Sequence, residues 1–241
     1  MAIAAEAEGA GTATGCLGET GGGTGSSKMK VTITYDNEVC QQGLLPDWGF
    51  SCLVEMENGI KLLFDTGADD YILLHNMTRL NIDPASIDSI FISHSHFDHM
   101  GGLAGILELN KKAKVFTPSS DFWQITDNRL IRVEEAIQIY PGIFSTGELR
   151  NIEQSLIIAT DKGVVAIVGC SHCGVEQILN KASQFGQPFA IIGGLHGFNR
   201  FQLLADLQLI CPCHCTSYKR EIKSLLPEKY IECGAGRVIA L

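Results

Sequence analysis

The sequence lacks several features that would place it in a particular class of protein. Its 241 residues contain no apolar run of the ~20 residues that a membrane-spanning helix needs. Basic residues are in the minority, with 18 Lys and Arg against 27 Asp and Glu, for a formal net charge of −9. Nucleic-acid-binding proteins usually present a basic face to phosphates. We therefore expect no membrane and no nucleic acid as partner, but a small-molecule substrate. A local basic patch still allows this substrate to be phosphorylated.

The first 28 residues lack aromatic side chains, and they lack Lys and Arg until Lys28 itself. The segment has neither the basic start nor the apolar stretch of a secretory signal, and its three glutamates are unlike a transit peptide. Eight glycines make it compositionally different from the rest of the chain. We expect residues 1–28 to be a flexible tail, residues 29–241 to form the domain, and the protein to be cytoplasmic. The oligomeric state is left open.

Cysteine, in contrast, is plentiful, with nine residues. Five of them stand in two short stretches: Cys170, Cys173, Cys211, Cys213 and Cys215. Without a secretion signal we expect no disulfide framework, and we interpret Cys40 and Cys52 as small hydrophobic residues on strands. The two cysteine-rich stretches together could instead hold a structural zinc ion, because thiolates bind zinc tightly.

From Met29 onward, strand and helix patterns alternate. We expect strands over 30–35, 50–55, 60–64, 87–93, 113–117, 154–160, 164–169, 189–193 and 237–241, with a further short one ending near Cys215. We expect helices over 71–80, 102–109, 175–185 and 200–209. Each half of the domain is rich in strands and then alternates strand and helix. This order predicts an α/β fold of two mixed sheets packed face to face, with helices on the outer faces.

The most informative segment is His94-Ser-His96-Phe-Asp98-His99, which follows an apolar strand and precedes two glycines. On an extended strand end, His94 and His96 point to the same side. A turn at Phe97 then brings Asp98 and His99 beside them. Two imidazoles and a neighbouring carboxylate–imidazole pair can serve two adjacent metal positions. Of the seven histidines, only His75 lies within a helical pattern, where ordinary packing or a hydrogen bond explains it.

This segment resembles the hallmark of the metallo-β-lactamase-fold superfamily, an αββα sandwich with a metal site at one edge. Further matching segments are Phe64-Asp65-Thr66-Gly67, Gly169-Cys170-Ser171-His172, Gly193-Gly194-Leu195-His196 and His214-Cys215-Thr216. Together with Asp36-Asn37, Gly49-Phe50-Ser51 and His75-Asn76, they resemble the branch that includes dihydropterin–ribofuranosylaminobenzene-phosphate synthases. The resemblance covers residues 29–241.

The resemblance implies two metal positions, one held by His94, His96 and His172 and the other by Asp98, His99 and His214. One or two divalent transition metals are expected; zinc suits the donors best, and iron or manganese also accept such N/O sites. The bridging position departs from the family pattern, since Gly169-Cys170 stands where most members carry an Asp. Cys170 and His196 are both candidates for it. Asp65 is expected to orient ligand rings from behind.

Three functions remain open at this point. The first is a metal-dependent hydrolase of a small ester or phosphoester, in which a metal-bound hydroxide attacks and Asp98 aims it. The second, implied by the resemblance, is a transferase that joins a pterin methyl group to an aminobenzene ribotide. The third is a metal-binding protein without activity. Lys219 and Arg220 are candidate phosphate contacts or a solvated helix start, and Trp48 could stack on a flat substrate ring or belong to the core.

Overall fold

Two β-sheets form the centre of the molecule. The computed structural model describes residues 28–119 and 128–241. The first sheet consists of β1 (Met29–Tyr35), β2 (Ser51–Met56), β3 (Lys61–Phe64), β4 (Ser89–Phe91), β5 (Lys114–Pro118), β6 (Leu130–Val133) and β13 (Val238–Ala240), in the order β13-β1-β2-β3-β4-β5-β6. The second consists of β7 (Ile137–Tyr140), β8 (Ile143–Ser145), β9 (Leu156–Thr160), β10 (Gly163–Val168), β11 (Pro188–Gly194) and β12 (Leu209–Cys213), in the order β12-β11-β10-β9-β8-β7.

Both sheets are mixed. Strands β3 to β6 run parallel to one another in the first sheet, as do β10, β11 and β12 in the second. The other pairings are antiparallel. Neighbouring parallel strands end at the same edge of their sheet, so the loops that follow them gather there.

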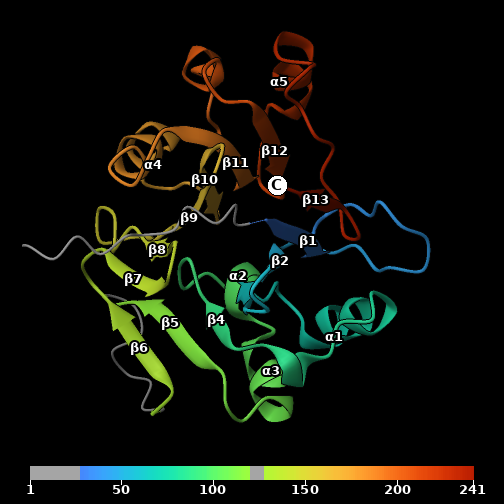
Figure 1. Cartoon of the computed structure of the whole chain (residues 1–241). Coiled ribbons are helices and arrows are strands. Elements are labelled where there is room, and N and C mark those ends of the chain that lie inside the picture. The colour runs from blue at the N-terminus through green and yellow to red at the C-terminus, as the bar shows by residue number, and fades with distance from the viewer. Residues whose placement is uncertain (1–27, 120–127) are drawn as a thin grey trace, which may run out of the picture.

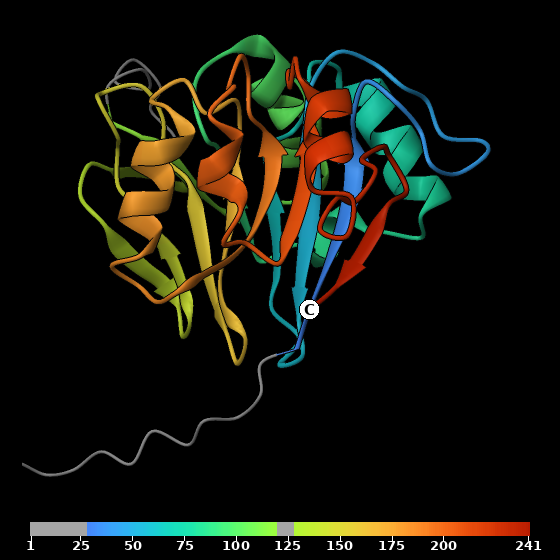
Figure 2. The ribbon, with the colours of Figure 1, turned by 90° about the horizontal axis from the view of Figure 1, so that it is seen from above.

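Helices cover the outer faces, as Figures 1 and 2 show. Against the first sheet pack α1 (Asp70–Arg79) and α3 (Leu103–Leu109), and against the second pack α4 (Val175–Ala182) and α5 (Lys219–Leu225). The short α2 (Phe97–Met100) and two 3₁₀ turns, Pro84–Ser86 and Phe201–Leu204, complete the elements. Helix α1 begins where the Asp69 side chain accepts a hydrogen bond from the Ile72 backbone, a cap worth about 1 kcal/mol.

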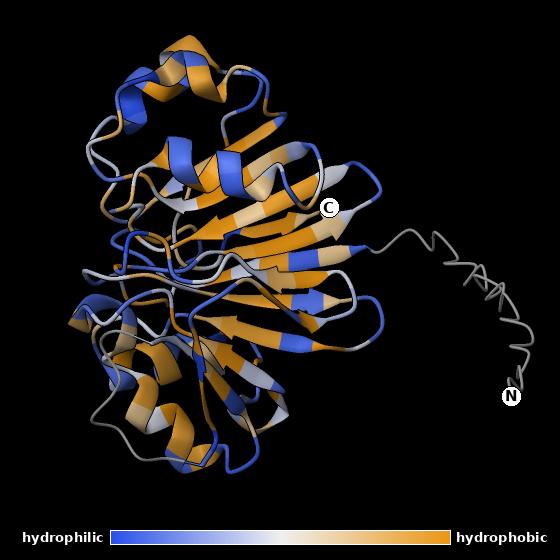
Figure 3. Cartoon of the chain, turned by 90° about the vertical axis from the view of Figure 1, so that its left-hand side faces the viewer, coloured by the Kyte–Doolittle hydropathy of each residue, from blue (hydrophilic) through white to orange (hydrophobic). Residues whose placement is uncertain are grey.

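The core follows the period-two geometry of strands. In β3, Leu62 and Phe64 pack between the sheets while Leu63 packs against the helical layer. In β10, Val165 and Ile167 face the first sheet and Ala166 faces α4. Because both faces of each sheet are buried, the strands are apolar along most of their length, as the hydropathy colouring of Figure 3 shows. The expected αββα sandwich is confirmed.

Some expected elements differ. The helix expected over 200–209 is only the 3₁₀ turn Phe201–Leu204, because Leu209 already begins β12, where it pairs with Ala190 of β11. Leu204 and Leu207 are both buried, and their spacing of three imitates a helix. Strands β6, β7 and β8 were not expected, and α5 was considered only as a helix start at Lys219. The expectation for Cys52 on β2 is confirmed, whereas Cys40 is exposed and lies outside the named strands.

The thiols also differ from expectation, because Cys213 is disulfide-bonded to Cys233, with Cα atoms 5.3 Å apart. The backbone of Ile231 donates to the Ile210 carbonyl, and this pairing brings Cys233 alongside the end of β12. Sequence spacing cannot reveal such a contact. The proposed tail, residues 1–28, lies outside the described residues except for Lys28. Within the described ranges, no helix has the length and apolar character needed to cross a membrane.

Candidate metal centre

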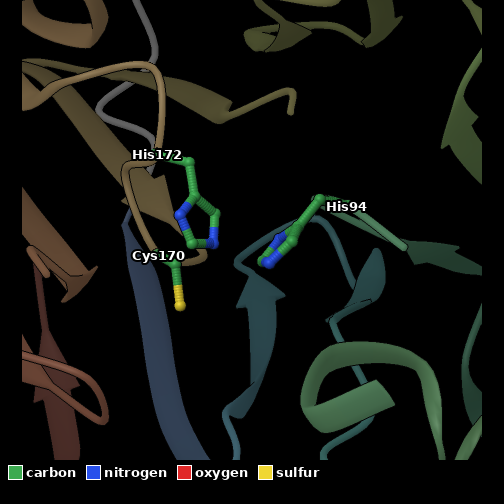
Figure 4. A group of neighbouring side chains, drawn as sticks. All are labelled: His94, Cys170 and His172. Atoms are coloured by element: carbon green, nitrogen blue, oxygen red, sulfur yellow. The ribbon is translucent and has the colours of Figure 1, made fainter. Parts of the chain in front are cut away.

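Loops from both sheets meet at one edge of the sandwich. From the first sheet, Asp65 follows β3, and the segment from His94 to His99 follows β4 and extends into α2. From the second, the segments containing Cys170 and His172, His196, and His214 follow β10, β11 and β12 in turn. Figure 4 shows His94 on one side and Cys170 with His172 on the other, with their side chains directed toward the same space.

The backbone turns sharply as it leaves these strands. Asp65, Ser171, His196 and His214 have φ angles of 52°, 57°, 47° and 45°, in the left-handed region that residues other than glycine rarely adopt. Such conformations cost roughly 1–3 kcal/mol each and tend to occur at functional sites. Here they redirect the chain at four of the strand ends that surround the histidines.

One group of ligand-type side chains consists of His94, Cys170 and His172, whose donor atoms lie within 4.8 Å of one another. His96 joins it, with Nδ1 3.1 Å from His94 Nε2. His172 Nε2 is buried and has no hydrogen-bond partner in the described part of the chain. A buried ring nitrogen without a partner is costly, and a bound cation would satisfy it.

A second group consists of His99, Cys170 and His214, again within 4.8 Å of one another. His99 Nε2 lies 3.1 Å from Cys170 Sγ, and Asp98 Oδ2 lies 3.1 Å from His214 Nε2. Cys170 therefore belongs to both groups. The spacing of imidazole, thiol and carboxylate donors fits two adjacent divalent cations.

His196 occupies a different place. The residue is exposed and its ring centroid lies 5.1 Å from that of His172, but it belongs to neither group of three. Of the two candidates for the bridging position, Cys170 is therefore the one whose side chain reaches both groups.

A buried network holds the ligand rings from behind. Asp65 Oδ2 lies 2.7 Å from His99 Nδ1, and its two oxygens accept hydrogen bonds from the Ser93 backbone and hydroxyl at 2.7 and 2.8 Å. Ser93 Oγ lies in turn 2.9 Å from His94 Nδ1. Holding Nδ1 in this way turns Nε2 of both rings toward the site. The sequence pointed to Asp65 for this place but not to Ser93.

Asn37 and Trp48 hold the opposite side of the site. Asn37 Oδ1 lies 2.9 Å from His214 Nδ1, and the Trp48 indole donates a hydrogen bond of 2.9 Å to Asp98 Oδ2. The Trp48 ring also lies 4.7 Å from the His214 ring, with 52% of the residue exposed. Trp48, considered above for stacking on a substrate or for the core, thus supports Asp98 and leaves part of its ring in solvent.

Electrostatics favour the cation-binding forms of three histidines and of Asp98, whereas the Cys215 side chain and burial raise the pKa of the Cys170 thiol. Burial lowers the pKa of His94, His99 and His172, and neighbouring histidines lower it further, so these rings are neutral at pH 7. For Asp98, burial acts to raise the pKa, but the hydrogen bond with the His214 side chain outweighs it, and the pKa is lowered overall. Its carboxylate is consequently ionised at neutral pH.

The remaining predicted residues are more peripheral. Lys219 and Arg220 begin α5 and, with Thr216 and Ser217, line a cavity of about 550 Å³ next to the His214 turn. His75 lies 3.0 Å from the Gly43 carbonyl oxygen, the ordinary hydrogen bond expected for it.

The cysteine-rich stretches do not come together as a single zinc site. Cys170 joins the histidines, whereas Cys173 is buried on the outer side of the second sheet, where its backbone donates to Glu153. Cys211 and Cys213 face the space between the sheets.

Comparison with known proteins identifies the family of the chain. The model of the metallo-beta-lactamase superfamily matches residues 49–176. The chain belongs to this superfamily. Members of the superfamily bind divalent metals. The chain is 30% identical to the 7,8-dihydropterin-6-methyl-4-(beta-D-ribofuranosyl)-aminobenzene-5'-phosphate synthase of Methanocaldococcus jannaschii, in a match that covers 80% of this chain and 91% of that protein.

Two solved structures show the same fold. A metal-dependent hydrolase of the beta-lactamase superfamily aligns with a TM-score of 0.73 and 24% identity, over 88% of this chain and 98% of the other. Zn²⁺-bound PqqB of Methylobacterium extorquens aligns with a TM-score of 0.61 and 14% identity, over 88% and 100%. At these identities the likeness concerns the fold.

Proposed function

We propose that this protein is a metal-dependent hydrolase of a small ester or phosphoester. The observation that carries the proposal is the double membership of Cys170 in two groups of ligand-type side chains, next to the unpartnered Nε2 of His172. His94, His96 and His172 would hold one cation, Asp98, His99 and His214 the other, and the Cys170 thiolate would be shared. Zinc is the ion we propose, because imidazole and thiolate donors suit it better than they suit magnesium or calcium.

Bound divalent cations would supply water activation at neutral pH and polarisation of a substrate oxygen. The residues of the chain do the rest. The Asp98 carboxylate, held by Trp48 and His214, would accept a hydrogen bond from the attacking water and orient it. Asp65 and Ser93 keep the His94 and His99 rings in place, and Asn37 does the same for His214. Because these supports are hydrogen-bonded in advance, little reorganisation is needed when substrate binds.

A transferase is the second candidate, and a specific comparison favours it. The relative from Methanocaldococcus jannaschii is named as a synthase of a phosphorylated compound, and the match spans most of both chains. Lys219 and Arg220, beside the cavity next to His214, would then contact a phosphate group of the substrate. The same set of residues would serve to bind and orient a phosphorylated acceptor in place of water.

Metal content and activity test the proposal together. Purified protein should contain one to two transition-metal ions per chain by elemental analysis, and chelation should abolish turnover that added zinc, iron or manganese restores. Hydrolysis of a panel of p-nitrophenyl phosphodiesters and carboxylic esters supports the hydrolase. Condensation of a pterin methyl diphosphate with an aminobenzene ribotide, without ester hydrolysis, supports the transferase. Metal-bound protein without turnover in either assay favours a binding protein, and active protein without metal contradicts all three.

A further inference from the structure

Cys170 has a second cysteine beside it. Cys215 follows His214 after the end of β12, whereas Cys170 follows β10, so the two are 45 residues apart in the chain. Cys215 Sγ lies 3.9 Å from the Cys170 carbonyl oxygen. The fold thus brings the Cys215 thiol against Cys170, directly next to the candidate metal centre.

Gly194 makes room for this contact. It ends β11, the strand between β10 and β12. A Cβ atom at this position would lie 2.7 Å from Cys215 Sγ and 3.3 Å from Cys170 Cα, and it would also run into the Gly169 carbonyl oxygen. Any larger residue here would therefore separate both the strand ends and the two cysteines.

The two thiols differ in access to solvent. Cys170 is buried, with 3% of the residue exposed, and its sulfur faces His99 and the other ligand-type side chains. Cys215 is only partly buried. A small oxidant arriving from solvent would therefore meet Cys215 before Cys170.

We propose that Cys170 and Cys215 form a reversible disulfide, and that this oxidation removes the sulfur shared by the two halves of the metal centre. The thiolate is the form of cysteine that binds metal, and a disulfide sulfur is a poor substitute for it. The disulfide itself depends only on the contact between the two cysteines. Its effect on metal binding rests on the function proposed above.

Hydrogen peroxide is a suitable oxidant, and each step balances. The Cys215 sulfur attacks the peroxide O–O bond, which gives Cys215 sulfenic acid and one water. The Cys170 sulfur then attacks the Cys215 sulfur; the S–S bond forms, the S–O bond breaks, and the hydroxyl group leaves as a second water with the Cys170 proton. A dithiol such as dithiothreitol reverses the change by thiol–disulfide exchange and becomes a cyclic disulfide itself.

The existing Cys213–Cys233 disulfide provides an internal control. It lies in the core between the sheets, and Cys213 belongs to neither histidine group. The variant C233S removes this bond without touching the proposed pair. The variants C215S and C215A remove the proposed partner while leaving Cys170 in place.

The test begins with chelated, metal-free protein treated with hydrogen peroxide. Free thiols are alkylated, the protein is digested, and the peptides are identified by mass spectrometry. We expect a peptide pair linked through Cys170 and Cys215 in the wild type and in C233S, and its loss after dithiothreitol. Zinc uptake should be largely lost after oxidation and recovered after reduction. Zinc bound beforehand should slow the formation of the link.

The variants C215S and C215A, checked for folding by circular dichroism, should keep zinc uptake after treatment with hydrogen peroxide. The inference is overturned if Cys170 and Cys215 are recovered alkylated or separately over-oxidised, or if C215S and C215A lose zinc uptake as the wild type does. If reduced protein binds no zinc but the linked peptides form, the proposed metal centre is contradicted and the proposed disulfide is supported. If zinc binds and no link forms, only this inference fails.

Discussion

The two sheets contribute to the candidate metal centre in different ways. The first supplies His94, His96, Asp98 and His99 from six consecutive residues after β4. The second supplies Cys170, His172 and His214 from loops after two different strands, separated by more than 40 residues. The first set is arranged by local geometry, because a strand end followed by one helical turn brings its side chains together. The second exists only because β10, β11 and β12 are parallel neighbours.

The largest effect on metal content and activity is expected from removing one ligand of each set. H96A and H172A should each lose most of the bound metal and lower kcat by at least about a hundredfold, because both remove an imidazole from the same group of donors. H75A is the matched control. The contacts described for the His75 ring are a hydrogen bond with the Gly43 carbonyl and the nearby Tyr71 ring, so this variant should change neither metal content nor kcat. Elemental analysis and steady-state kinetics measure both. If H172A kept full metal content, the second sheet would play no part in metal binding.

The next effect concerns the side chain that joins the two sets. C170S should weaken binding of the ion near His99 and His214 more than that of the other ion, because only two imidazoles remain at that position and three at the other. A neutral hydroxyl is a poor ligand at pH 7 compared with a thiolate. C170D should restore binding of two ions, since it reintroduces an anionic donor. Zinc titration calorimetry resolves the two steps, and an unchanged titration of C170S, with loss of one ion in H196A, would transfer the bridging role to His196.

A smaller effect on metal affinity is expected from Asp65, which supports the ligands of the first set. D65N replaces the carboxyl group that contacts His99 and Ser93 by an amide of nearly the same volume. Supports of this kind typically change metal affinity by 10- to 100-fold. We expect zinc affinity to fall by a factor in that range, with the secondary structure unchanged in circular dichroism. D69N, at the cap of α1 and outside the site, is the control, and an equal loss of affinity in D69N would show that D65N acts through general stability.

The smallest expected effect is on stability and concerns Glu153, which supports the loop that carries His172. This buried carboxylate accepts a hydrogen bond of 2.9 Å from the Cys173 backbone and so holds the turn that carries His172. Burial raises the pKa of Glu153 above its usual value. The stability that protonated Glu153 contributes is therefore fully present at pH values below the unfolded-state pKa of the group. It is lost as the pH rises through the folded-state pKa.

The variant E153Q keeps an acceptor for the Cys173 N–H but cannot ionise. The stability of the wild type relative to E153Q should therefore increase as pH is lowered from 7 toward 4.5, as measured by urea unfolding at a series of pH values. E148Q, on a carboxylate that accepts from the Ser119 hydroxyl away from this turn, is the control. A difference between wild type and E153Q that does not vary with pH would contradict the ionisation of Glu153.

Much of the fold was predictable because its strands are buried on both faces and therefore form clear apolar runs, as in β3, β4 and β10. The misses have physical causes. In the edge strands β6 and β7 most residues are only partly buried, so their pattern is weak. At Leu204 and Leu207, burial against the second sheet gave helical spacing to a segment that is a turn followed by a strand.

The sequence by itself determined the superfamily, the sandwich architecture and the first set of candidate ligands, because each depends on short-range periodicity or on consecutive residues. Only the tertiary structure placed Cys170, and not His196, in both groups of ligand-type side chains, brought Trp48 against Asp98, joined Cys213 to Cys233 and set Cys215 beside Cys170. The reason is that these contacts join residues from different strand ends. Their distances are set by the order of strands in the sheets and by the left-handed turns at Ser171 and His214, which spacing along the chain does not encode.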